Sequence, residues 1–180
     1  MGIFEMAGSP TRIAELQLAF DSPPRYGKDL DWTGNTVHDA ANLLLRYLIQ
    51  LPEPVIPYAF YDRFQRPAQQ SSSAWSNSEN VVTYYESVIT ELPPLNRQLL
   101  FYILDVLAVF ADKSSINLMT TIKLAALFQS AILEHPGCQL DLEHARMNQS
   151  VVAFLIEKEL ERDEPRKPPR LDRAAQASSD

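Results

Sequence analysis

The chain has 180 residues, of which 46% are hydrophobic, so it is long enough for one domain with a substantial core. Its net charge of -7 and pI near 5.0 argue against a nucleic-acid-binding surface, because phosphate recognition needs a basic patch. A single cysteine, Cys138, excludes a disulfide framework and a cysteine-based zinc site, and it fits a reducing intracellular compartment.

The N-terminus has no basic region followed by an apolar stretch, so we expect no secretory signal. The longest uncharged apolar runs, 99–104 and 106–111, are separated by Asp105 and are shorter than the roughly 20 residues of a membrane span. We therefore expect a soluble, cytoplasmic protein without a membrane span, whose partner is another protein rather than a nucleic acid.

The first predicted helix opens at Ser9 and Pro10, where the serine hydroxyl is expected to cap an N–H group and proline suits the first helical position. Residues 21–27, DSPPRYG, end it. Its apolar face is formed by Ile13, Leu16 and Phe20. Gly8 is expected to permit the turn that precedes this helix.

Thr36 and Asp39 have the spacing of a capping box and predict a second helix that reaches Gln50. Its apolar stripe consists of Val37, Ala40, Ala41, Leu44 and Leu48. A short helix is expected after Pro57, over YAFYDRF, followed by a polar loop at 65–80.

The second half of the chain is also helical in pattern. Val81, Tyr85, Val88 and Leu92 mark one helix, and 94–113 is apolar nearly all round, as expected of a central helix buried on most sides. Helices are further expected over 120–133 and from an Asp141 cap onward. No segment alternates in the manner of a strand, so we predict an all-α fold of about six helices, with a domain over 1–161 and a disordered tail over 162–180.

Enzymatic sites have little support in this sequence. His38, His135 and His144 lie on different elements without metal-ligand spacing, and surface or helix-capping roles are favoured for them. Asp105 is expected to face solvent or bind a nearby donor, and Cys138 to be an inert thiol. The tail segment 165–170, PRKPPR, has the PxxP spacing read by SH3-type grooves, but a solvated tail is favoured.

Three blocks occur in a specific order: GIFxxxGS ahead of a helix, RYLIQLPEPVIP at the end of another, and NLMTTIKLAALF near the start of a late helix. Together they resemble the Rho GTPase-activating protein (RhoGAP) domain, and 26–47 and 128–136 look most like its fungal members. The resemblance covers about residues 2 to 160. It implies an all-α regulator that binds Rho-type small GTPases and speeds their GTP hydrolysis, and is not an enzyme by itself.

GTP and magnesium would belong to the partner GTPase, so no cofactor of the chain's own is expected, and the partner could draw the chain to a membrane. The family's domain usually begins with further helices before GIF. The resemblance therefore implies a chain that is N-terminally truncated or has lost that part of the fold.

Four residues depart from the family pattern. Glu5 occupies the position of the family's catalytic arginine, Lys123 that of a supporting asparagine, Leu45 that of a common lysine or arginine, and Ser130 that of a proline. An arginine finger contributes a factor of about 10³ to 10⁵ to the rate, so its replacement implies weak or absent activation. Glu5 and Lys123 are expected either to form an ion pair or to be independent surface substitutions.

Arg12 and Arg46 are the remaining basic residues near the implied face, where they would contact the GTPase or be solvated. For Ile3, Phe4, Leu51 and the LPEPVIP prolines, a role in chain path and packing is favoured over direct contact with the GTPase. The leading function is a GTPase-binding domain with lost catalysis. The alternatives are an interaction module whose tail or loop 65–80 recruits another protein, an activator in which Lys123 replaces the finger, and a decayed fragment that does not fold stably.

Overall fold

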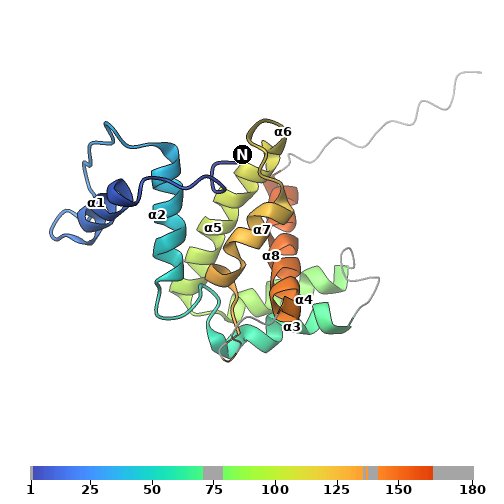
Figure 1. The fold of residues 1–180 in the computed structure, drawn as a ribbon. Coiled ribbons are helices and arrows are strands. Elements are labelled where there is room, and N and C mark those ends of the chain that lie inside the picture. Colours follow the sequence, from blue (N-terminus) through green and yellow to red (C-terminus); the bar gives the residue numbers. More distant parts are fainter. Residues whose placement is uncertain (1, 71–78, 136, 138–141, 164–180) are drawn as a thin grey trace, which may run out of the picture.

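The computed structural model describes residues 2–70, 79–135, 137 and 142–163, and these residues form eight α-helices, one short 3-10 helix and no strand (Figure 1). The all-α prediction is confirmed, although the count exceeds the expected six. The helices are α1 (Pro10–Asp21), α2 (Val37–Ile49), η1 (Tyr58–Phe60), α3 (Tyr61–Gln70), α4 (Glu79–Glu91), α5 (Pro94–Asp112), α6 (Ser114–Asn117), α7 (Thr121–Ile132) and α8 (Leu142–Asp163).

The core lies where α7 packs against α5 and α8. Figure 1 shows these three helices at the centre of the molecule, with α1 and α2 on one side and α3 and α4 at one end. Leu100, Leu107 and Phe128 are fully buried there, so apolar burial in this cluster is the main stabilising contribution. α8 continues to Asp163, two residues past the predicted domain boundary, and the rest of the predicted tail lies outside the described residues.

The LPEPVIP segment packs against the C-terminal end of α7. The N–H groups of Val55 and Ile56 donate to the carbonyls of Ala131 and Ile132 at 3.0 and 2.9 Å. The Asn96 side chain donates to the Val55 carbonyl at 3.0 Å. Pro54 and Pro57 are buried beside Val55 and Ile56, as the packing role expected of the prolines requires, whereas Pro52 is exposed.

The α2 cap agrees with the sequence pattern, because Thr36 and Asp39 form the reciprocal hydrogen bonds of a capping box. The apolar stripe predicted for α2 is only partly buried. Ala41 and Leu48 are buried, whereas Val37 and Leu44 are exposed, as is Phe20 on α1.

α3 extends three residues beyond Pro67, where the sequence favoured a loop. A proline inside a helix leaves the carbonyl four residues earlier without its usual donor. Here that carbonyl belongs to Arg63, and the Tyr84 hydroxyl of α4 donates to it at 3.0 Å. A partner on a distant helix thus satisfies the group that proline leaves free, which local sequence rules could not show.

α5 differs from the expectation that it is buried on most sides. Leu100, Leu104 and Leu107 face the core, but Tyr102 and Val109 are exposed on the opposite face. By length and composition α5 is the one helix in the described part of the chain that could cross a membrane, a property that buried helices of soluble proteins share. Its packing against α7 and α8 assigns it to the core.

Candidate functional site

Glu5 lies in a tight turn that its own carboxylate stabilises. The Glu5 N–H donates to the Gly2 carbonyl at 3.0 Å, and the Gly2 N–H donates to Glu5 Oε2 at 2.8 Å. Gly2 packs so closely on Met119 that an added Cβ would lie 1.9 Å from its sulfur. The acid therefore has a local structural role as well as its place in the GIF block.

Phe4 anchors this turn to the core. Its buried ring makes edge-to-face contacts with Phe110 of α5 and Phe128 of α7, with ring centroids 5.2 and 5.0 Å apart. With Phe4 directed into the protein, the next side chain, that of Glu5, lies at the surface. The packing role predicted for Phe4 is confirmed.

Glu5 and Lys123 form an ion pair. Lys123 Nζ lies 3.0 Å from Glu5 Oε1, and the two side chains are 45% and 28% exposed, respectively. Lys123 belongs to the first turn of α7, where its N–H donates to the side chain of the N-cap residue Thr120. The Gly2 N–H and then the Lys123 ammonium lower the pKa of the Glu5 carboxyl. Of the two arrangements expected from the sequence, the structure has the pair.

α2 holds the other side of the same turn. His38 Nδ1 lies 3.0 Å from the Ile3 carbonyl oxygen, and Asn42 Nδ2 donates to the Met6 carbonyl at 2.9 Å. The sequence favoured a surface or capping role for His38. Its ring is instead half-buried and contacts the Glu5 turn. Sequence reasoning did not single out Asn42, although it lies one helical turn after His38 on the same face.

Asp39 connects the start of α1 to the start of α2. Its fully buried carboxylate accepts from the N–H groups of Ser9 and Thr36, both at 2.7 Å, and from Arg12 Nε at 2.8 Å. The Arg12 guanidinium beside it, with these N–H donors, holds the pKa of Asp39 well below its usual range. Gly8 is needed for space, since an added Cβ would lie 2.6 Å from Asp39 Oδ1.

At this point the structure corrects the expectation for Ser9 and adds a contact within the chain to those expected of Arg12. The Ser9 side chain makes no capping bond, and its main-chain N–H binds Asp39 instead. Arg12, expected either to contact a partner or to be solvated, is engaged by Asp39 within the chain, although 39% of its side chain stays exposed.

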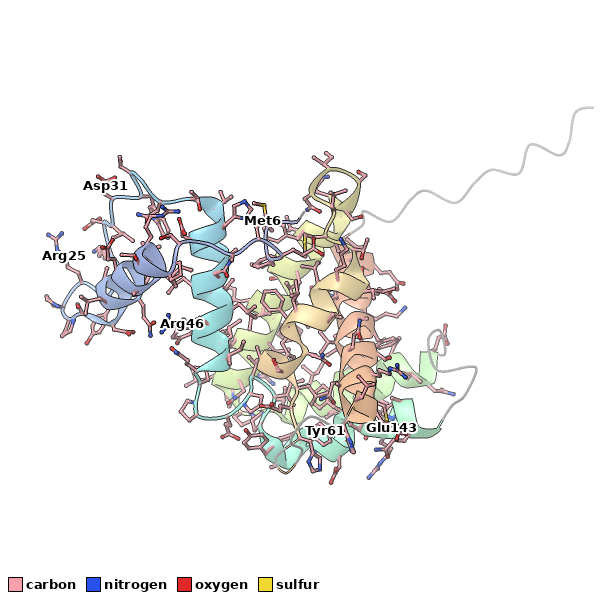
Figure 2. All side chains as sticks on the ribbon, viewed as in Figure 1. Met6, Arg25, Asp31, Arg46, Tyr61 and Glu143 are labelled. Atoms are coloured by element: carbon pink, nitrogen blue, oxygen red, sulfur yellow. The ribbon has the colours of Figure 1, made fainter. Side chains whose placement is uncertain are left out.

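The remaining predicted site residues lie on α2 and α7. Leu45 is half-buried against the core, on the face of α2 that also carries His38 and Asn42. Arg46 is exposed in the last turn of α2 (Figure 2). Ser130 is exposed two turns after Lys123 on α7. The structure thus joins Glu5 to Lys123 directly and leaves the others on neighbouring helical surfaces.

The other candidate residues give no catalytic arrangement in the described part of the chain. His135 and His144 lie with ring centroids 5.4 Å apart, and His135 also contacts Tyr61. No group of three or more metal-ligating side chains occurs among the described residues. Asp105 is exposed, while Cys138 and Asp141 lie outside the described residues.

These features define an all-helical domain whose candidate site is a partly exposed ion pair on a packed turn. Residues 1–137 match the RhoGAP domain family, and the chain belongs to that family. It is 46% identical to Rho-GTPase-activating protein 5 of Schizosaccharomyces pombe over 155 residues and 38% identical to Rho-GTPase-activating protein BAG7 of Saccharomyces cerevisiae over 156 residues. Each match covers 86% of this chain but only 42% and 38% of the relatives, so the chain spans less than half of their length.

Two solved structures share the fold of this chain. The crystal structure of the BH domain from GRAF, the GTPase regulator associated with focal adhesion kinase, aligns with a TM-score of 0.74 at 24% identity, covering 88% of this chain and 81% of that one. Human Rho GTPase activating protein 15 aligns with a TM-score of 0.73 at 20% identity, covering 87% and 72%. The RhoGAP-like fold expected from the three sequence blocks is confirmed.

Proposed function

We propose that this chain is a RhoGAP domain that binds a Rho-type small GTPase in signal transduction and activates GTP hydrolysis weakly or not at all. The observation that carries this proposal is the Glu5–Lys123 ion pair on the Phe4-anchored turn, at the position where the family resemblance implies an arginine. A domain that regulates a GTPase supplies no complete catalytic site of its own. GTP and magnesium belong to the partner.

The chemistry of Glu5 supports the loss of catalysis. The transferring phosphoryl group carries negative charge, and activators stabilise it with a guanidinium worth a factor of about 10³ to 10⁵ in rate. A carboxylate repels that charge, and the Gly2 N–H and the Lys123 ammonium lower the pKa of Glu5 and so favour its ionised form. Lys123 is a poor substitute for the arginine, because an ammonium lacks the planar fork that binds two phosphate oxygens at once.

The surface around the pair is suited to protein binding. Leu45 and Ser130 lie on the same helical faces as the residues that hold the Glu5 turn, and Arg46 adds an exposed cation. Arg12 is held by Asp39 and contributes through its exposed part. We expect these residues to contact the GTPase, in the cytoplasm or at a membrane to which the GTPase recruits the chain.

The test is single-turnover GTP hydrolysis by a panel of Rho-type GTPases with the full chain. Wild type is expected to leave the rate within about tenfold of the intrinsic rate, whereas Glu5→Arg combined with Lys123→Asn is expected to raise it by about 10³. Glu5→Arg alone should give less, because the new guanidinium lies beside the Lys123 ammonium. Met6→Arg, which adds a cation at the exposed neighbouring position, is the matched control and should not accelerate hydrolysis.

Acceleration of about 10³ or more by wild type would overturn the assignment of lost catalysis. If no variant accelerates hydrolysis, binding to the GTPase loaded with GDP and aluminium fluoride decides the remaining question. Binding supports a GTPase-binding domain without catalytic potential, and its absence across the panel supports an interaction module or a decayed fragment instead.

A further inference from the structure

A pocket of about 600 Å³ lies between α1, α2 and the connection between them. Three aromatic side chains from these three segments line it: Phe20, Trp32 and Tyr47. All three are substantially exposed, and the Phe20 and Trp32 ring centroids lie 6.4 Å apart in a tilted arrangement. Aliphatic residues of α2, with Leu51 after it, complete the apolar wall. The pocket therefore offers aromatic surface to a ligand from more than one side.

The charge of this pocket has one sign. Among the described residues that line it, Asp21 alone is charged, and it is the last residue of α1. The carbonyl end of a helix carries partial negative charge, which adds to that of the carboxylate. Gln17 of α1 donates to Gln50 at 3.0 Å, which links the two helices along the pocket. Aromatic faces and a carboxylate both attract a cation.

A second pocket, between α4, α5 and α8, differs from the α1–α2 pocket in the charges of the residues that line it. It measures about 690 Å³ and is also largely apolar, but the described residues that line it include three cations and three acids. Two of these cations are already paired, Lys158 with Glu161 at 2.7 Å and Arg162 with Glu159 at 3.0 Å. The second pocket therefore favours neither a positive nor a negative ligand, whereas the α1–α2 pocket favours a positive one.

We propose that the α1–α2 pocket binds an arginine side chain presented by a partner protein. A guanidinium is planar, stacks on aromatic rings and is more weakly hydrated than an ammonium, so it matches the Phe20, Trp32 and Tyr47 rings while pairing with Asp21. The volume exceeds that of one side chain, which leaves room for the adjoining residues of an extended segment.

This pocket lies on a different side of α2 from Leu45, although Arg46, which we also expect to contact the GTPase, is one helical turn from the pocket residues Leu43 and Gln50. Its α2 residues Ala40, Leu44 and Tyr47 follow helical spacing along one side of the helix. Leu45 lies on another side, with His38 and Asn42. Occupation of the pocket is therefore compatible with a GTPase that contacts Leu45, and the inference does not depend on whether a GTPase binds.

The test follows the Trp32 indole N–H signal by NMR during titration of the full chain with N-acetyl-Ala-Arg-Ala-amide. The matched probe replaces arginine with citrulline, which keeps the shape and removes the charge. We expect millimolar binding of the arginine peptide, about 5-fold tighter than that of the citrulline peptide. A Trp75→Phe background leaves a single tryptophan, so the signal is unambiguous.

Two substitutions that remove one negative charge separate the pocket from general electrostatics. Asp21→Asn should abolish the preference for arginine over citrulline, whereas Asp105→Asn, on the exposed face of α5, should leave it unchanged. Equal affinity for the two peptides would overturn the proposal in favour of a neutral apolar occupant. The proposal would also be overturned if the Trp32 signal did not respond, or if Asp21→Asn and Asp105→Asn lost the preference for arginine equally.

Discussion

Two acids hold the N-terminal segment in place, and they do so in opposite environments. Asp39 is fully buried and accepts hydrogen bonds from Ser9, Thr36 and Arg12. Glu5 is partly exposed and is held by the Gly2 N–H and the Lys123 ammonium. A buried carboxylate with several donors cannot be exchanged without leaving polar groups unpaired, whereas an exposed pair can. A substitution at Glu5 should therefore disturb the scaffold less than a substitution at Asp39.

The largest expected effect comes from removing the buried acid. Asp39→Ala leaves the Ser9 and Thr36 N–H groups and the Arg12 guanidinium without their acceptor. We expect the Tm to fall by about 10 °C in a thermal melt followed by circular dichroism. The Tm of Asp39→Asn should fall less, since the amide oxygen still accepts hydrogen bonds. A change under about 2 °C in Asp39→Ala would contradict this account of the network.

A smaller loss is expected from Gly8→Ala. The added Cβ would lie 2.6 Å from Asp39 Oδ1 and 2.9 Å from its Cα, so either the loop or the α2 backbone must shift. We expect the Tm to fall by about 5 °C. Gly137→Ala is the matched control, because the nearest atom to its Cβ, in His135, lies at an ordinary 3.5 Å. Equal melting temperatures for the two variants would show that the space at Gly8 is not limiting.

The comparison between wild type and Asp39→Asn should depend on pH. The pKa of Asp39 in the folded protein lies below that of the unfolded chain, near 3.9. Its contribution is therefore complete above about pH 5 and is lost as the pH falls through the folded-state value. Melts from pH 7 to pH 3 should show the Tm advantage of wild type shrinking below about pH 4. An advantage that grows on acidification would contradict the assignment.

The smallest effect is expected at the exposed pair. Glu5→Gln keeps an acceptor for the Gly2 N–H and removes the charge opposite Lys123. Exposed ion pairs contribute little, so we expect a Tm change under about 3 °C at low salt and none resolved at 1 M salt, where charges are screened. A loss as large as that of Asp39→Ala would mean that Glu5 is part of the scaffold.

Much of the fold could be predicted from the sequence because its signals are local. The Thr36–Asp39 capping box, Pro10 at the start of α1 and the α7 pattern around Phe128 all depend on neighbours within a few residues. The Glu5–Lys123 pair is predicted, as one of two arrangements, only through the family resemblance. Spacing within the chain gives no sign of it.

The features that the sequence did not predict depend on contacts between residues far apart in the chain. The sequence predicts Asp39 as part of a helix cap, but its bonds to Ser9 and Arg12 span 30 and 27 positions and have no sequence signature. α3 passes Pro67 because Tyr84 supplies a donor. The exposure of Phe20 likewise follows from the pocket that it shares with Trp32 and Tyr47, which the helical pattern of α1 does not reveal.

The Asp39 network also sets an order of assembly. Its bonds to Thr36 form as soon as α2 begins, whereas those to Ser9 and Arg12 require α1 to arrive from across a connection of more than ten residues. α1 packs against α2 rather than against the central helices (Figure 1). It should therefore be the last helix to dock and the first to open, and its amides should exchange with solvent before those of α5, α7 and α8.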